Sequence, residues 1–91
     1  MKVRITVEPR FEKGLKKLPP DRARAAAETL LKFQGEPALP RLDFRPLKGK
    51  AGHYIIDARH GDRIILRKDA DDLYAAVDVG PHDNVYRRLK R

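Results

Sequence analysis

The chain has 91 residues and a formal net charge of +8, with 21 lysine and arginine residues against 13 aspartate and glutamate residues. This length suffices for one modest hydrophobic core, so we expect a single domain spanning residues 1–91. The absence of cysteine excludes disulfides, thiolate metal sites and cysteine nucleophiles. The basic surplus predicts a polyanionic partner, nucleic acid first and an acidic protein second. The alternative is a basic surface that only confers solubility.

The N-terminal stretch predicts a strand. Val3, Ile5 and Val7 alternate with charged and polar residues, which is typical of a strand with one buried face. The same stretch lacks the hydrophobic core of a signal peptide, and no apolar run approaches the roughly 18 residues of a membrane helix. We therefore expect a cytoplasmic protein that makes no membrane contact.

Two helices are predicted next. The first begins at Pro9, carries apolar residues at helical spacing and stops at the pair Pro19-Pro20. The second is the alanine-rich segment DRARAAAETLLKF, which begins at Asp21 and ends near Gly35. Its expected apolar stripe is Ala23, Ala26, Ala27, Leu30 and Phe33. Its expected solvent face is Arg22, Arg24, Glu28 and Lys32.

The C-terminal half predicts three strands after a long connection. The segment GEPALPRLDFRPLKGKAG has no periodicity, and connections of this length in a compact domain are usually functional or disordered. Alternating residues then predict strands over 53–59, 63–67 and 73–79, joined by short turns as an antiparallel meander.

The element order is therefore β-α-α-β-β-β, which predicts an α+β fold. Two N-terminal helices would pack on one face of a four-stranded, mainly antiparallel sheet. The other face would stay open and carry the polar residues Asp57, Arg59, Arg63, Arg67, Tyr74 and Asp78.

The candidate chemistry is metal-free. The three histidines have no metal-ligand spacing, and the chain has neither a glycine-rich phosphate loop nor a nucleophile elbow. We expect no metal and no cofactor. Phosphodiester chemistry on RNA fits this set, because RNA supplies its own nucleophile, the 2′-OH.

Two cations are candidates for this chemistry. Lys48 lies in the glycine-flanked stretch RPLKGK, although loop lysines are mostly solvated. Arg63 opens a predicted strand, where a cross-strand ion pair with Asp57 or Asp78 is the structural alternative. Further basic residues are candidates for RNA binding: Arg45, Lys50, Arg59, Arg67, Arg87 and Arg88.

A histidine and a tyrosine complete the candidate site. His82 follows the last predicted strand and the turn Gly80-Pro81, and Tyr86 comes four residues later. Their structural alternatives are an exposed turn histidine and a ring that caps the core. Histidine side chains exchange protons near neutral pH, so His82 is the candidate acid or base.

The stretches FEKGLKKLPP, RPLKGK, GDRIIL and VGPHDNVYRR, in this order, resemble the RelE/ParE toxin superfamily of bacterial toxin–antitoxin systems. The resemblance runs from Val3 to Arg88. It implies the same β-α-α-β-β-β order and a toxin that cuts mRNA in the ribosomal A site without metal, leaving a 2′,3′-cyclic phosphate. It also implies an acidic antitoxin that wraps the basic toxin and masks its site.

The resemblance implies roles for particular residues. Lys48 matches the loop lysine of the family, and Arg63 matches the arginine that opens the third strand. His82 falls where members carry either arginine or histidine, and the histidine resembles that of the YafQ and HigB branches, where it is a catalytic acid or base. Tyr86 falls at the aromatic position four residues later. Asp62 falls near a carboxylate that YafQ-like members use.

The chain also departs from the family. Asp83 stands where many members have a basic residue, Pro81 is unusual, and Ala58 falls where YafQ-like members carry a second histidine. ParE-like gyrase inhibitors lack the nuclease residues, so retention of Lys48, Arg63, His82 and Tyr86 favours an endoribonuclease. The alternatives are a gyrase inhibitor and a basic nucleic-acid-binding module that acts only in a repressor complex.

Overall fold

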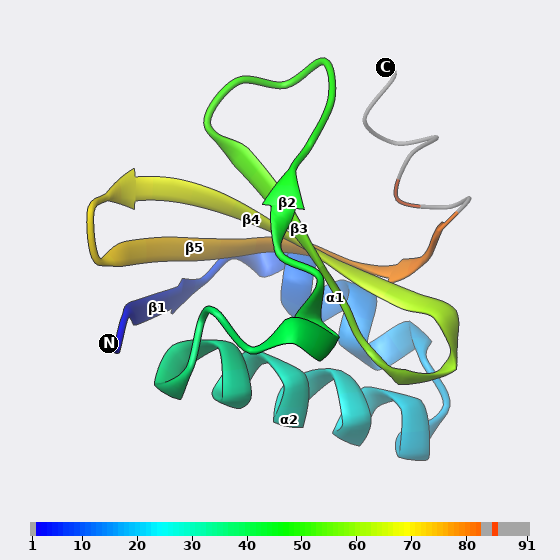
Figure 1. The fold of residues 1–91 in the computed structure, drawn as a ribbon. Helices are drawn as coiled ribbons and strands as arrows, with labels where there is room; N and C mark the ends of the chain where they lie inside the picture. The colour runs from blue at the N-terminus through cyan, green and yellow to red at the C-terminus, as the bar shows by residue number, and fades with distance from the viewer. Residues whose placement is uncertain (1, 83–84, 86–91) are drawn as a thin grey trace.

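The structure, a computed structural model, describes residues 2–82 and residue 85. Figure 1 shows helices on one side of a twisted sheet. The elements are β1 (Arg4–Val7), α1 (Pro9–Lys17), α2 (Pro20–Gly35), β2 (Arg45–Pro46), β3 (His53–Asp57), β4 (Asp62–Ala70) and β5 (Leu73–Pro81), with short 3₁₀ turns η1 (Pro40–Leu42) and η2 (Arg59–Gly61). No helix in this described part of the chain has the length and apolarity to cross a bilayer.

The sheet has five strands in the order β1-β5-β4-β3-β2. β1 is parallel to β5, and the remaining pairs are antiparallel. The predicted α+β fold is confirmed, with β2 as an additional strand. β2 gave no sequence signal because it is two residues long and lies in the proline-containing connection, where Arg45 pairs with Ile55 and Pro46 with Tyr54.

The main core lies between the helices and the sheet. Phe11 of α1 and Phe33 of α2 are buried against the sheet residues Ile56, Ile64 and Leu66. The expected stripe of α2 is rotated, since Ala27 is exposed and Ala23 half-buried, whereas Ala25 and Thr29 are buried. The Thr29 hydroxyl donates a hydrogen bond to the carbonyl of Ala25 at 2.8 Å, so its polar group is satisfied inside the helix.

Tyr74 belongs to this main core, so its expected place on the open face is wrong. The reason is a bulge in β5: Leu66 pairs with Ala76 and Ile65 with Asp78, which leaves Val77 as an extra residue. A bulge of this kind shifts the alternation of side chains by one. Tyr74 then shares the helix side with Val79, and its ring packs edge-on against Phe33 at 5.2 Å.

A second cluster covers part of the opposite face of the sheet. Leu47, Ile55, Ile65 and Val85 are buried there, with Val77 packed against them. The face that was expected to be open is therefore partly covered, by the loop after β2 and by Val85. This cluster brings Leu47, in the loop between β2 and β3, close to Val85.

α1 takes the place of a strand beside the second half of β5. β1 ends at Val7, which pairs with Ala76, and the chain turns there into α1. Gly14 makes the close approach possible: a Cβ at this position would lie 2.7 Å from the carbonyl oxygen of Val79 and 2.9 Å from Val79 Cγ1. Pro81 has no N–H, so it suits a strand edge that no other strand covers.

We predict that Gly14→Ala destabilises the protein although alanine favours helices. The new methyl group would press on the Val79 backbone, and such overpacking costs about 1–3 kcal/mol, against about 1 kcal/mol gained from helix propensity. Gly35→Ala is the matched control, since nothing lies within 4 Å of its Cβ position. Urea denaturation of both variants measures the change. Equal stability of the two variants would contradict the close packing of α1 on β5.

Candidate functional site

Arg63 lies on the sheet face opposite the helices and is held by an aspartate. Its Nε lies 3.2 Å from Asp57 Oδ1, across the β3–β4 pair. The same oxygen accepts a hydrogen bond from Arg45 Nη2 at 3.2 Å. The structural alternative for Arg63, an ion pair with Asp57, is therefore present. The contact holds the Arg63 guanidinium, a group whose several N–H donors suit phosphate oxygens.

His82 lies at the same end of the sheet as Arg63. Arg63 pairs with Gly80 of β5, and His82 is the exposed residue that follows β5. Gly80 has no side chain, so nothing on β5 blocks the approach to Arg63 at this register. The other predicted residues of this segment, Tyr86, Arg87 and Arg88, lie outside the described residues.

Lys48 is exposed in the turn after β2, beyond the His53 end of β3. Arg63 pairs with Asp57 at the other end, so the length of β3, about 13 Å at 3.3–3.4 Å per residue, separates the two registers. Leu47, next to Lys48, packs in the same apolar cluster as Val85. The start of the loop that carries Lys48 and Val85 therefore meet over the sheet.

Of the residues predicted to bind RNA, some are paired with carboxylates and others are exposed. Arg67 pairs with Glu8 at 3.3 Å and with Asp69 at 2.7 Å. Its hydrogen bonds and charge lower the pKa of Asp69. The positive charge of Arg67 is therefore largely compensated. Lys50 is exposed and lines a pocket of about 340 Å³ together with Arg67.

Arg59 is not on the sheet face, so its expected position is wrong. β3 ends at Asp57, two residues earlier than the alternation predicted, and Arg59 belongs to the η2 turn. It borders a small pocket next to α2 with Lys32 and Arg41. Alternation of polar and apolar residues could not locate this end of the strand. Asp57 and Arg59 are two residues apart and both charged, so the alternating pattern continues past the residue where β3 ends.

Arg22 and Asp62 form an ion pair that the sequence patterns did not predict. Arg22 was expected to face water, but it donates two hydrogen bonds to Asp62, one from Nε at 3.0 Å and one from Nη2. The Asp62 side chain has no exposed area, and the hydrogen bond raises the pKa of Arg22. Asp62 therefore fastens α2 to the start of β4. This contact is structural, and both carboxylate oxygens of Asp62 are occupied by it.

The fold is similar to that of known toxins. A chain of the toxin–antitoxin complex RelBE2 from Mycobacterium tuberculosis is 22% identical, covers 90% of this chain and 100% of its own, and superimposes with a TM-score of 0.73. A mutant of the Escherichia coli toxin RelE in the free state is 19% identical, covers 100% of this chain and 98% of its own, and superimposes with a TM-score of 0.70. A chain of the Escherichia coli DinJ–YafQ toxin–antitoxin complex is 17% identical, covers 94% of this chain and 99% of its own, and superimposes with a TM-score of 0.67.

No protein-family model and no curated protein sequence matches the chain. At these identities the similar structures establish the fold. The chain has the RelE-like fold, as its resemblance to the RelE/ParE superfamily implied.

We predict that Arg22→Ala destabilises the protein, because it leaves the buried Asp62 carboxylate without its partner. Breaking a fully buried pair costs about 3–5 kcal/mol, and the partial exposure of Arg22 places the expected loss at or below the lower end of this range. Arg24→Ala removes the same charge from the exposed face of α2 and should change stability by less than about 0.5 kcal/mol. Chemical denaturation compares them. An equal, small loss in both variants would show that Asp62 does not depend on Arg22.

Proposed function

We propose that the chain is the toxin of a type II toxin–antitoxin pair and acts in the cytoplasm as a metal-independent endoribonuclease that cuts mRNA on the ribosome. The observation that carries the proposal is the juxtaposition at one end of the sheet of Arg63, fixed by Asp57, with the strand end that presents His82. Support comes from the RelE-like fold, which the chain shares with RelE and with a chain of the DinJ–YafQ complex.

The proposed reaction is an internal transesterification. The RNA 2′-OH attacks the adjacent phosphorus, the O2′–P bond forms and the P–O5′ bond breaks. The products are a 2′,3′-cyclic phosphate and a 5′-OH. The 2′-OH loses a proton and the leaving oxygen gains one, and His82 carries out one of these transfers. Arg63 and Lys48 stabilise the charge of the phosphorane, and Tyr86 stacks on or orients the nucleotide.

Asp57 has a positioning role in this proposal. An arginine on an exposed sheet face has many rotamers, and holding it in one of them before substrate arrives reduces the entropy lost on binding. Asp57 lies 3.2 Å from Nε of Arg63, and the remaining N–H groups of the guanidinium are the donors proposed for the phosphate. Arg45, bound to both Asp57 and Asp43, holds the carboxylate on its other side.

We predict that His82→Ala lowers the single-turnover rate of mRNA cleavage about 10²- to 10⁴-fold, the usual contribution of general acid–base catalysis. Stability should change little, because His82 is exposed. The matched control is His60→Asn, since His60 is exposed in a turn at φ 65, a conformation that asparagine tolerates. The assay is primer extension on ribosome-bound mRNA with each purified variant.

Cleavage by His82→Ala at the wild-type rate would remove His82 from the chemistry. Absence of cleavage by the wild-type protein, together with induction of an SOS response in cells, would favour gyrase inhibition instead. A neighbouring reading frame that encodes a short acidic protein with a DNA-binding segment would support the toxin–antitoxin setting.

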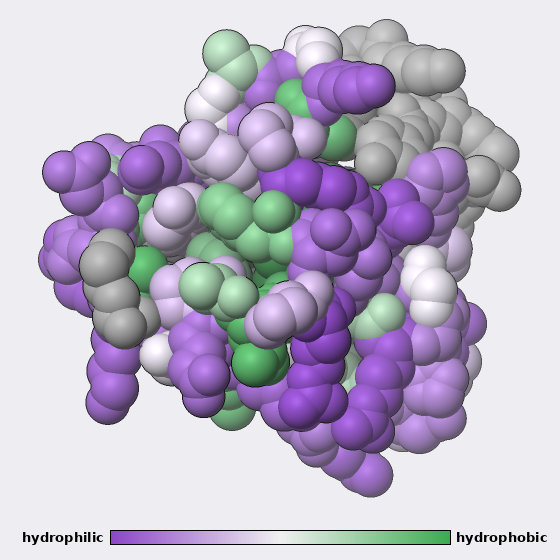
Figure 2. Space-filling view, viewed as in Figure 1, coloured by the Kyte–Doolittle hydropathy of each residue, from purple (hydrophilic) through white to green (hydrophobic). Residues whose placement is uncertain are grey.

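The proposed partner is an acidic antitoxin, and the molecule has an apolar surface for it. A groove of about 400 Å³ lies between β1, α1 and α2 and is lined mainly by apolar residues: Ile5, Val7, Phe11, Leu15, Ala27, Leu30, Leu31 and Gln34. Leu31 is 66% exposed and Val7 44%, although most of the face in Figure 2 is hydrophilic. An amphipathic antitoxin segment would bury these side chains, and its acidic residues would meet the surrounding positive charge.

We predict that Leu31→Glu weakens the complex with the antitoxin at least tenfold, because it places a charge where an apolar anchor should be buried. Lys32→Gln changes the net charge by the same amount on the same helix, on a side that borders a different pocket, and should weaken binding less than about threefold. Isothermal titration calorimetry measures both. Equal losses in the two variants would mean that general electrostatic attraction, and not this groove, holds the partner.

A further inference from the structure

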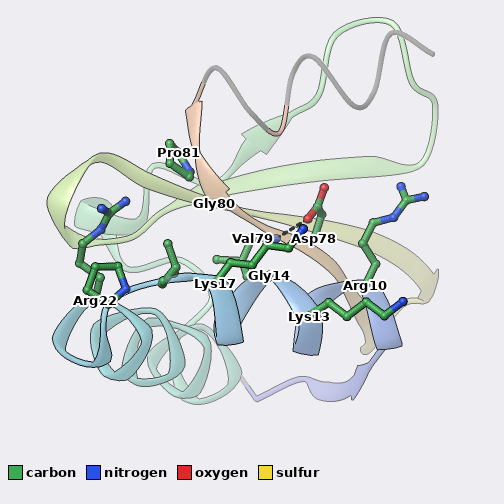
Figure 3. A pocket seen from close by; sticks show the side chains of 11 residues that line it. Arg10, Lys13, Gly14, Lys17, Arg22, Asp78, Val79, Gly80 and Pro81 are labelled. Carbon is green, nitrogen blue, oxygen red and sulfur yellow. Dashed lines mark hydrogen bonds between the residues drawn. The ribbon is translucent and has the colours of Figure 1, made fainter.

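A basic groove lies between α1 and the second half of β5, away from the apolar groove. Its volume is about 340 Å³. Figure 3 shows Lys13 and Lys17 along α1, Arg10 at one end and Arg22 at the other, beside the strand residues Asp78 to Pro81. The packing of Gly14 on Val79 sets the depth of the groove, since a side chain at Gly14 would push the helix away from the strand.

The charge of the groove is positive and largely uncompensated. No ion pair of the described part of the chain involves Arg10, Lys13 or Lys17, and all three are exposed. Arg22 is held by Asp62. The one acidic residue that lines the groove is Asp78, which is 2% exposed and accepts a hydrogen bond from the Val79 N–H through Oδ1.

The spacing of the cations concentrates this charge on one side of α1. Arg10, Lys13 and Lys17 follow one another at intervals of three and four residues, which places them on one helix face over about 10 Å of axis. Neighbouring like charges at this spacing repel one another and destabilise a helix. A row of phosphates along one strand, each with a negative charge, would neutralise these cations and relieve the repulsion.

The groove runs up to the strand end that precedes His82 in the candidate site. One end is formed by Gly80 and Pro81, directly before His82. The other end shares Arg10 and Asp78 with the pocket that Lys50 and Arg67 line. The basic surface therefore continues from the strand end along α1 and around to the loop after β2.

We propose that this groove binds the phosphate backbone of a single nucleic-acid strand, and that Arg10, Lys13 and Lys17 hold phosphates next to the one that is cut. The inference rests on the proposed function, because the strand is taken to be the one that reaches His82. A nucleic acid fits better than a protein segment. Protein interfaces need buried apolar anchors, and the exposed large hydrophobic residues among those described, Val7 and Leu31, lie in the other groove.

The test is fluorescence anisotropy with a labelled 12-nucleotide RNA whose riboses are 2′-O-methylated, so that it cannot be cut. Lys13→Ala/Lys17→Ala is compared with Lys16→Ala/Arg24→Ala, which removes the same charge from α1 and α2 at positions outside the groove. We expect the groove variant to bind at least tenfold more weakly at about 0.1 M salt. We also expect the slope of log K against log salt to fall by about 1.4 for two lost phosphate contacts on a single strand. The control variant should lose less than about threefold.

Each outcome decides the inference. Equal losses in both variants would overturn it, since net charge alone would then account for binding. An unchanged affinity for RNA with a lost affinity for an acidic peptide, measured with the same two variants and a labelled glutamate-rich peptide, would assign the groove to a protein partner instead. The probe needs no cleavage, so wild-type protein that binds through the groove but cuts no mRNA would refute the proposed function and leave the groove assignment standing. Circular dichroism of each variant confirms that it is folded.

Discussion

The arrangement of this protein depends on the parallel pairing of β1 with β5. Arg4 pairs with Leu73 and Val7 with Ala76, so the first strand of the chain joins the sheet as an edge strand beside β5, the last strand. The Arg4 guanidinium reinforces the start of this pairing through Asp72, and it lowers the pKa of that carboxyl. Because β1 stops at Val7, α1 must begin there, and its backbone settles on Val79. The strand end at His82 and the helix face with Lys13 thus have their relative positions set by one non-local contact.

The distribution of charge separates structural cations from those available to a partner. Three arginines pair with carboxylates of other segments of the fold: Arg22 with Asp62, Arg67 with Glu8 and Arg45 with Asp57. Among the described residues, the exposed cations outside these pairs include Lys13 and Lys17 on α1 and Lys48 in the loop after β2. These three are available to a partner, whereas the charges of Arg22, Arg67 and Arg45 serve the fold.

Much of the fold follows from periodicity in the sequence, and the exceptions have physical causes. Alternation located β1, β4 and β5, and prolines and glycines located the helix ends, since these signals are local. Alternation failed at Val77, because a bulge is defined by the partner strand, and it missed β2, because two residues carry no period. The ion pair of Arg22 with Asp62 joins residues far apart in the sequence, and neither residue type indicates a partner. For the candidate site, the cross-strand contact of Arg63 with Asp57 was among the alternatives, because strand register alone suggests it. The roles of His82 and Tyr86 came from family resemblance and stay predictions.

The brevity of β2 bears on self-association. Sheets grow from molecule to molecule when an edge strand presents a row of unused N–H and C=O groups. The outer edge here has two residues, Arg45 and Pro46, and proline contributes no N–H. A second molecule arriving at this edge would find too few backbone groups to form a ladder. The truncated strand therefore disfavours strand addition at the β2 edge, beside the loop that carries Lys48 and Lys50.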